Sequence, residues 1–262
     1  MIDLGQLLKK AQSRIARGIL ELMWRKNTHY DINGYDRIYF IHIRKTGGTS
    51  LNHMFLSLGD NDPGKLYEEL SRKPDHRIVR REKIFVGWNK KYINEGKYYY
   101  AFSHNPIYNL ELPMNTFTVT IFRDPVKRVL SHYKMLLEYH ENNIYRSDFE
   151  KEAEWLGDSF EDFVDRIPKE HLMNQLWMFS KSFNVSEAYE RVQKVSHCFF
   201  AADFEKGITR LNEKLGLELK SLHIRKTSIQ ANVTNNALEL LREMLTDEYR
   251  FLGLLHNRSC NI

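Results

Sequence analysis

The chain has 262 residues, of which 42% are hydrophobic and 13% aromatic, and it carries a formal net charge of +5 at pH 7. This composition excludes a disordered chain, and the length fits one α/β domain with a full core. No apolar run is long enough to cross a bilayer, the first 26 residues are charged throughout, and two cysteines are too few for a disulfide framework, so we expect a cytoplasmic protein.

The N-terminal segment predicts an amphipathic helix. Apolar residues recur at near-helical spacing over residues 2–24, and the basic residues lie mostly on the opposite face. We expect this helix, within residues 1–30, to pack on the rest of the domain. The alternative is a peripheral contact of residues 1–26 with a membrane surface, because basic amphipathic helices bind at lipid interfaces.

Beyond residue 36, short segments rich in Ile, Val, Phe and Tyr alternate with helical patterns. The strand candidates are 37–43, 83–87, 97–102, 116–122 and 196–201. The helix candidates are 49–58, 125–139, 159–166, 169–180, 186–195, 203–215, 234–245 and 247–255. The alternation predicts βαβ units, and therefore a single α/β domain whose central, mainly parallel sheet is flanked by helices. The segment 59–82 is predicted to be rich in loops, and the charged segment 141–158 to be an exposed connection.

One segment, Arg37–Asn52, has the sequence RIYFIHIRKTGGTSLN, in which a short apolar strand runs into a glycine-rich turn and then into a helix. Backbone N–H groups, hydroxyls and a lysine at a helix N-terminus form a cradle for a phosphate group. A Walker loop places its lysine after the glycines, whereas Lys45 precedes Gly47 and Gly48 here. We therefore expect a phosphorylated ligand of a different kind.

This turn, followed by FTVTIFRDPVKRVLSHY at 117–133, resembles the sulfotransferases that use 3'-phosphoadenosine-5'-phosphosulfate (PAPS). The likeness is to the carbohydrate type, with the uronyl and heparan sulfate 2-O-sulfotransferases and their bacterial relatives. It implies a P-loop-kinase-like sulfotransferase fold over the single domain 1–262, with a catalytic core at 37–255. It also implies PAPS as donor and adenosine 3',5'-bisphosphate (PAP) as product. No metal is expected, because the histidines are scattered and the two cysteines are far apart in the sequence.

The resemblance also implies which residues hold the donor. Those around the 5'-phosphosulfate are Arg44, Lys45, Thr46, Gly47, Gly48, Thr49 and Ser50. Arg123 and Ser131 match the pair that grips the 3'-phosphate, and arginine suits this role because its planar fork bonds two oxygens at once. Lys226 and Ser228 lie in a basic loop where relatives close over the 3'-phosphate or the adenine. Asp124 and Pro125 open a helix, as a capping residue and a first-turn proline do.

Sulfuryl transfer needs a group that stabilises the departing phosphate oxygen and a group that takes the acceptor's proton. We assign the first role to Lys45, whose ammonium can donate to the bridging oxygen. We assign the second to His104, which follows a strand end where the 2-O-sulfotransferases carry their proposed base. Other members of the family use a glutamate, so Glu95 and Glu111 are the alternatives.

Five other polar residues receive predictions of their own. His42 lies on a strand and is expected to be a packed core histidine, whereas His132 is expected to be exposed. Arg128 is expected to face away from the donor and pair with an acid. Asn174 and its neighbour Gln175 fall where relatives contact the acceptor or the donor, although helix capping or core packing explains them equally well.

The positive charge favours an anionic partner, which includes nucleotides, acidic glycans, membrane surfaces and nucleic acids. Together with the resemblance, it indicates a carbohydrate or glycolipid acceptor and no nucleic-acid partner. One alternative is a nucleotide-dependent kinase with the same sheet, which would need a Walker loop and an aspartate for magnesium. The other is a non-catalytic binder of nucleic acid or anionic lipid, whose binding would weaken steeply with salt.

Overall fold

The computed structural model describes residues 14–15, 18–22, 29–144, 147–222 and 229–259. Its centre is a six-stranded sheet in the order β2-β3-β4-β1-β5-β6. The strands are β1 (Arg37–Ile41), β2 (Arg77–Arg80), β3 (Lys83–Gly87), β4 (Tyr100–Ser103), β5 (Thr116–Phe122) and β6 (His197–Phe200). Every neighbouring pair is parallel except β2 with β3, which is antiparallel. The predicted α/β fold with a mainly parallel sheet is therefore confirmed.

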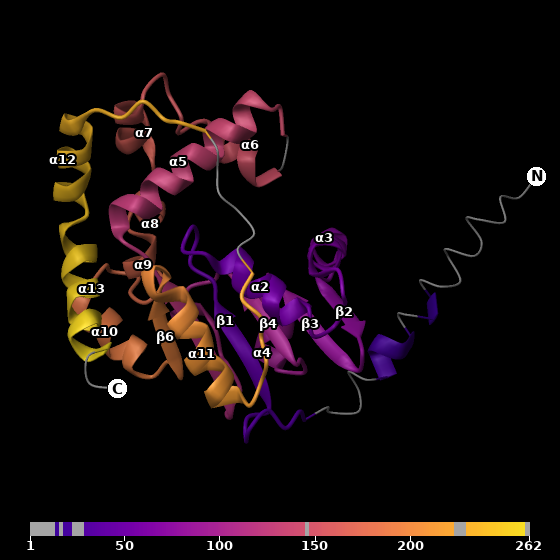
Figure 1. Ribbon diagram of the computed structural model, residues 1–262. Coiled ribbons are helices and arrows are strands. Elements are labelled where there is room, and N and C mark those ends of the chain that lie inside the picture. Colours follow the sequence, from indigo (N-terminus) through magenta and orange to yellow (C-terminus); the bar gives the residue numbers. More distant parts are fainter. Residues whose placement is uncertain (1–13, 16–17, 23–28, 145–146, 223–228, 260–262) are drawn as a thin grey trace, which may run out of the picture.

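Helices surround this sheet on both faces and at its carboxyl edge (Figure 1). The larger helices are α2 (Gly48–Leu56), α3 (Pro63–Arg72), α5 (Pro125–Glu141), α10 (Val185–Gln193), α11 (Phe204–Leu215), α12 (Asn235–Met244) and α13 (Thr246–Ser259). The shorter ones are α4 (Lys90–Glu95), α6 (Ser147–Ala153), α7 (Phe160–Arg166), α8 (Lys169–Leu172), α9 (Asn174–Trp177), and the 3-10 turns η1 (Ile107–Asn109) and η2 (Ala201–Asp203). Among the described residues, no helix is both long and apolar enough to span a membrane.

The sheet separates two hydrophobic clusters. Alternate residues of β1 enter opposite clusters: Tyr39 and Ile41 join the one covered by α5, α7–α10, α12 and α13, and Ile38 and Phe40 join the one covered by α2, α3 and α11. All five residues of β1 are buried. A strand buried on both faces reads as an uninterrupted apolar run, as Ile38–Ile41 does in the sequence.

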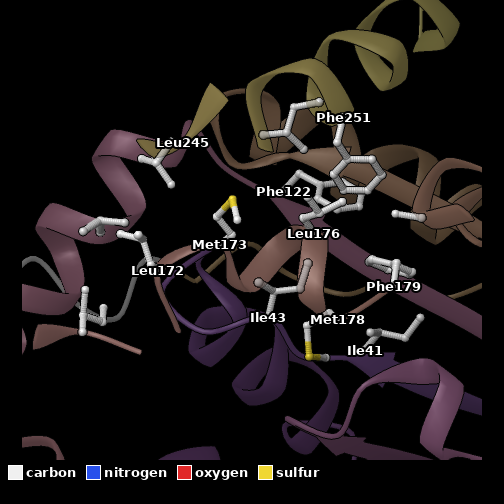
Figure 2. Packing of buried hydrophobic residues seen from close by; sticks show 14 of the residues in the cluster. Ile41, Ile43, Phe122, Leu172, Met173, Leu176, Met178, Phe179, Leu245 and Phe251 are labelled. Atoms are coloured by element: carbon white, nitrogen blue, oxygen red, sulfur yellow. The ribbon is translucent and has the colours of Figure 1, made fainter. Parts of the chain in front are cut away.

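The short helices α8 and α9 pack deep in the first cluster. Figure 2 shows Leu172, Met173 and Leu176 among the buried side chains of this cluster, together with Ile43, which follows β1, and Phe251 of α13. These apolar side chains fix the corner between the two helices. The helix predicted over 169–180 is therefore wrong in detail, because the chain departs from helical geometry at Met173, with φ −104° and ψ 48°.

The segment 59–82 is not mainly a loop, contrary to the prediction, because it contains α3 and β2. Asp62 caps α3 by accepting a hydrogen bond from the backbone N–H of Lys65 at 2.9 Å, and Pro63 occupies the first turn. Leu66 and Leu70 are buried on one face of the helix. Asp-Pro can begin a helix as well as a turn. Here the two leucines, four residues apart, lie on one buried face, which favours the helix.

The segment 141–158 is also only partly exposed. It contains α6, and it buries Glu152 and Leu156 at 6% exposure each. Charged residues dominate its sequence, so no local pattern indicated that one carboxylate would point inward.

Part of the predicted N-terminal helix is described, and residues 18–22 are helical. Leu20 is buried, and Glu21 forms an ion pair with Arg77 at 3.2 Å. Ile19 and Leu22 are exposed. The described part therefore contacts the domain, as expected, and leaves an apolar side toward solvent.

Candidate active site

The order of the strands brings three loops together. β1 lies between β4 and β5, and all three run parallel, so the turn after β1, the loop after β4 and the loop after β5 emerge at one edge of the sheet. Ile41 pairs with Ser103 of β4 and with Thr120 of β5. Open α/β sheets bind their ligands at this edge.

The turn after β1 depends on its two glycines for different reasons. Gly47 has φ +101°, a left-handed conformation that glycine adopts without steric cost. At Gly48, an added Cβ would lie 2.2 Å from Cδ2 of His42, so a larger residue cannot approach the strand so closely. Lys45 itself has φ +67°, which costs a non-glycine residue about 1–3 kcal/mol and persists only where neighbours enforce it.

Helix α2 begins directly after this turn without a capping side chain. Its N-cap is Gly47, which has no side chain to bond the first N–H groups. Thr49 and Ser50 stand half-buried in the first turn. The N-terminus of this nine-residue helix is therefore suited to an anion. The hydroxyl of Thr46 is already used, because it donates to the carbonyl oxygen of Ile43 at 3.0 Å and closes the turn.

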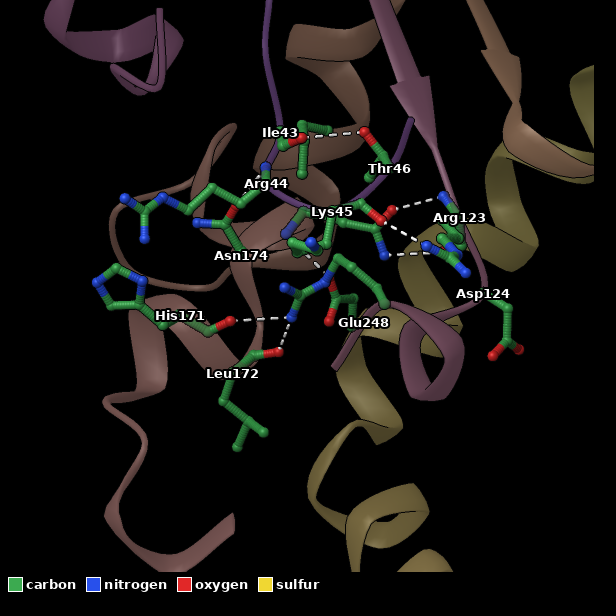
Figure 3. A network of polar contacts seen from close by, with 12 residues as sticks. Ile43, Arg44, Lys45, Thr46, Arg123, Asp124, His171, Leu172, Asn174 and Glu248 are labelled. Atoms are coloured by element: carbon green, nitrogen blue, oxygen red, sulfur yellow. Dashed lines mark hydrogen bonds and ion pairs between the residues drawn. The ribbon is translucent and has the colours of Figure 1, made fainter. Parts of the chain in front are cut away.

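Arg123 connects the two motifs that the sequence analysis singled out, the segment 37–52 and the segment 117–133. It follows β5, and its Nη1 donates to the carbonyl oxygen of Lys45 at 2.9 Å (Figure 3). Asp124 caps α5 by accepting from the N–H of Lys127 at 2.8 Å, and Pro125 follows in the first turn, as predicted. Ser131 is half-buried on the same helix. Residues 78 positions apart thus meet at the loop that the sequence singled out.

Asn174 and Gln175 hold these two loops from the α8–α9 corner. Asn174 Oδ1 accepts from the backbone N–H of Arg44 at 3.2 Å. Gln175 bonds Arg123 twice, accepting from its N–H at 2.8 Å and donating to its carbonyl at 2.9 Å. Adjacent residues of one buried corner therefore fix the backbone of both motifs. The sequence analysis named both residues as possible contacts of the donor or the acceptor. In the structure they hydrogen-bond to the backbone of Arg44 and Arg123.

A second layer lies beneath this corner. Arg128 is fully buried and donates to the carbonyls of His171 (at 2.9 Å) and Leu172, and its Nε lies 3.9 Å from Glu248 Oε1 (Figure 3). Glu248 also accepts from the N–H of Gln175 at 2.9 Å. Arg128 thus faces away from the donor loop and pairs with an acid, as expected.

His104 stands at the end of β4 beside the turn. Its Nδ1 lies 2.7 Å from the carbonyl oxygen of His42, and the two rings are 4.4 Å apart. A carbonyl only accepts, so Nδ1 carries the proton and Nε2 carries the lone pair. Burial, reinforced by the charge of Arg44, lowers the pKa of His104 to about 4. The imidazole is therefore neutral at pH 7, in the tautomer that leaves Nε2 as a proton acceptor.

His42 is buried in the core, as predicted, and burial lowers its pKa well below the ordinary value. The prediction for His132 is wrong: it is 1% exposed on α5, where its Nε2 lies 2.9 Å from Glu152 Oε2. A histidine next to serine on an amphipathic helix looks exposed until an acid from another helix covers it. The partner, Glu152, was not foreseen as a site residue.

The alternative bases lie elsewhere. Glu95 ends α4, just before Gly96, whose carbonyl accepts from Arg37 at the start of β1. The N–H of Glu111 donates to Asn94 of the same region. Both glutamates are exposed and stand near the amino ends of the strands, away from the edge that holds Lys45.

Two other predicted residues, Lys226 and Ser228, lie outside the described residues. Within the described part of the chain, no three His, Cys, Asp or Glu side chains cluster as a metal site would require.

An open, mainly parallel sheet with a glycine-rich turn after its central strand defines the class of α/β proteins that bind phosphorylated ligands at the carboxyl edge. Within that class, the sequence model of the Sulfotransferase family matches residues 28–253. The chain therefore belongs to the sulfotransferase family, and the expected PAPS-dependent sulfotransferase is confirmed.

A search of curated protein sequences finds no match. Among solved structures, the crystal structure of a sulfotransferase from Alicyclobacillus acidocaldarius is similar at a TM-score of 0.40 with 11% identity, over 84% of this chain and 95% of that chain. A likeness at this level carries no argument about the site.

Proposed function

We propose that this sulfotransferase moves the sulfuryl group of PAPS to a hydroxyl of a carbohydrate or glycolipid, with Lys45 stabilising the leaving phosphate and His104 as the general base. The single observation that carries the proposal is the hydrogen bond from Arg123 to the carbonyl of Lys45, because it joins the two donor motifs beside the loop of His104. A donor phosphorylated at both ends needs cationic groups, and the two motifs supply Lys45 and Arg123.

The proposed donor site starts at Lys45, because the guanidinium of Arg44, which the resemblance places around the 5'-phosphosulfate, is bound to Glu152. The N–H groups from Lys45 to Thr49 and the hydroxyls of Thr49 and Ser50 would surround the 5'-phosphosulfate, at a helix N-terminus without a capping side chain. Arg123 and Ser131 would hold the 3'-phosphate, and Lys226 and Ser228 would close over the nucleotide.

In the transfer step, the bond from sulfur to the bridging phosphate oxygen breaks while a bond from sulfur to the acceptor oxygen forms. The leaving oxygen gains negative charge, to which the Lys45 ammonium donates a hydrogen bond. The acceptor's proton passes to Nε2 of His104. With its pKa near 4, His104 is a weak base, so proton transfer has to accompany sulfuryl transfer, when the acceptor hydroxyl becomes acidic.

The acceptor class is supported by the resemblance to 2-O-sulfotransferases and by the net charge of +5, which favours an acidic glycan. Exposed Ile15, Ile19 and Leu22 support a peripheral membrane contact of the N-terminal helix, where a glycolipid would lie. A cytoplasmic location is part of the same proposal.

Thermal-shift titration tests the donor. We expect PAP to raise the melting temperature more than ATP or AMP at equal concentration, because only PAP offers the 3'-phosphate with the 5'-phosphate. Ser131→Ala should reduce the PAP shift and leave the AMP shift unchanged. Equal shifts from all three nucleotides would refute the assignment of Arg123 and Ser131.

The acceptor is tested by incubation with sulfur-labelled PAPS and an array of glycans and glycolipids. We expect the label on a carbohydrate hydroxyl. Label found on none of the sugars, but on a phenol or a protein in a parallel panel, would reject the carbohydrate assignment and retain the donor.

A further inference from the structure

Glu152 is a buried carboxylate bound from two sides at the edge of the donor turn. It belongs to α6, and its exposed fraction is 6%. Oε1 accepts a hydrogen bond from Nη1 of Arg44, 108 positions earlier in the chain, and Oε2 lies 2.9 Å from Nε2 of His132 on α5. One side chain therefore ties α6 to both the loop after β1 and the helix after β5.

The protonation states of Glu152 and His132 follow from their surroundings. Burial alone would raise the pKa of Glu152, but the hydrogen bond from His132 and the charge of Arg44 outweigh it and lower that pKa to about 2. Burial lowers the pKa of His132 to about 4, so the imidazole is neutral and donates from Nε2. Glu152 is thus ionised at neutral pH, and its countercharge is Arg44.

Arg44 directly precedes Lys45, and both ends of Arg44 are fixed. Its backbone N–H is held by Asn174, and its guanidinium by Glu152. In Figure 3 the Arg44 side chain extends away from Arg123. The backbone of Lys45 is meanwhile held in its left-handed conformation by the bond from Arg123 to its carbonyl.

A guanidinium is well suited to bind phosphate, because its planar fork can donate hydrogen bonds to two oxygens at once. Released from Glu152, the Arg44 head would remain tethered one residue from Lys45, where it could bind the donor in competition with Lys45. A buried ion pair adds little to stability on balance, because desolvation offsets the attraction, but it selects one geometry. The ion pair with Glu152 therefore keeps the Arg44 guanidinium apart from the Lys45 ammonium, which acts on the donor.

We propose that Glu152 is a positioning residue of the donor site: by binding Arg44 and His132 together, it keeps the Arg44 guanidinium off the donor and leaves Lys45 as the cation that meets the bridging oxygen. This inference rests on the proposed function. It assigns to α6, a helix outside both donor motifs, control over which cation contacts the donor.

The test is Glu152→Gln, which keeps the size of the side chain and an oxygen for His132 but removes the charge that holds Arg44. The matched control is Glu154→Gln, an exposed glutamate two residues further on. Calorimetry gives the Kd for PAP, conversion of PAPS to PAP gives turnover, and thermal unfolding gives the melting temperature of each variant.

We expect Glu152→Gln to bind PAP about 3- to 10-fold more tightly, since one more cation reaches the phosphates, and to turn over PAPS at least tenfold more slowly, since the donor is misaligned. The double variant Arg44→Met with Glu152→Gln should bring the Kd for PAP back to within about twofold of the wild type, because no free guanidinium remains. Glu154→Gln should match the wild type.

Three results would overturn the inference. They are an unchanged Kd and turnover in Glu152→Gln, a loss of PAP binding that merely follows a lowered melting temperature, and a double variant that binds PAP tenfold more weakly than the wild type. The last would mean that Arg44 contacts the donor directly. A wild type that binds PAP no better than AMP would instead contradict the proposed function itself.

Discussion

The turn after β1 and the helical segment from α6 to α9 meet at the same edge of the sheet, but they are built in different ways. The turn is specified by its own residues: a left-handed Gly47, a close approach at Gly48, and a helix start. The segment from α6 to α9 has weak local signals, and its buried polar side chains, Glu152 and Gln175, find their partners on other elements. The turn supplies residues for the proposed donor site, and the segment from α6 to α9 holds Arg44 and Arg123 in position through Glu152 and Gln175.

Lys45→Ala gives the largest expected effect and tests the turn. Without an ammonium at the bridging oxygen, turnover of PAPS should fall about 100- to 1000-fold, in the range found when one stabilising donor is removed from an active site. The affinity for PAP should change much less, because the N–H groups remain. Lys65→Ala, an exposed lysine on α3, is the control. Turnover within threefold of the wild type would remove Lys45 from the mechanism.

His104→Gln should lower turnover by about 100-fold, as the loss of a general base does, while PAP affinity is retained. In the wild type, kcat/KM should stay flat above about pH 5 and decrease as the pH falls through 4, where His104 becomes protonated. His140→Gln, at an exposed position on α5, is the control. A wild-type profile that instead falls below pH 6.5 would contradict the depressed pKa of His104.

Gln175→Ala tests the second region. It leaves the N–H and carbonyl of Arg123 without their partner, so the free energy of unfolding should decrease by about 1–3 kcal/mol. Because Arg123 then loses its fixed position, PAP should bind about tenfold more weakly. Urea unfolding and calorimetry measure the two effects, with the exposed Gln230→Ala as control. A loss of stability with full PAP affinity would show that the corner supports the fold without placing Arg123.

The pH dependence of stability gives the smallest expected effect. The pKa of His132 is about 4 in the folded protein, against the ordinary histidine value of 6.5 in the unfolded chain, so the unfolded chain binds more protons between these pH values. The stabilising contribution is complete above pH 6.5 and is lost as the pH falls toward 4. At pH 5 the loss is about 2 kcal/mol for this histidine.

Urea unfolding at pH 7 and pH 5 measures this loss. His132→Gln, whose amide can still donate to Glu152, should show a smaller difference between the two pH values than the wild type. An equal difference in both proteins would assign the acid sensitivity to other groups, such as His104 or His42.

The sequence by itself determined the parts that depend on neighbours in the chain. β3 and β5 have the predicted bounds, β1 begins at the predicted residue, and Asp124 caps its helix as foreseen. Each of these follows from an apolar run, a glycine or a capping side chain within a few residues, and such signals act locally. The family could be recognised for the same reason, since both motifs are short and continuous.

Only the tertiary structure decided which polar groups meet. His132 and Glu152 are 20 positions apart, Arg44 and Glu152 are 108 apart, and Gln175 lies 52 positions from Arg123. A carboxylate or an amide has the same appearance in sequence whether it faces water or a buried cation. Whether such a group is buried depends on packing against distant elements. Burial lowers the pKa of His132 and raises the pKa of Glu248, and no local sequence pattern indicates either effect.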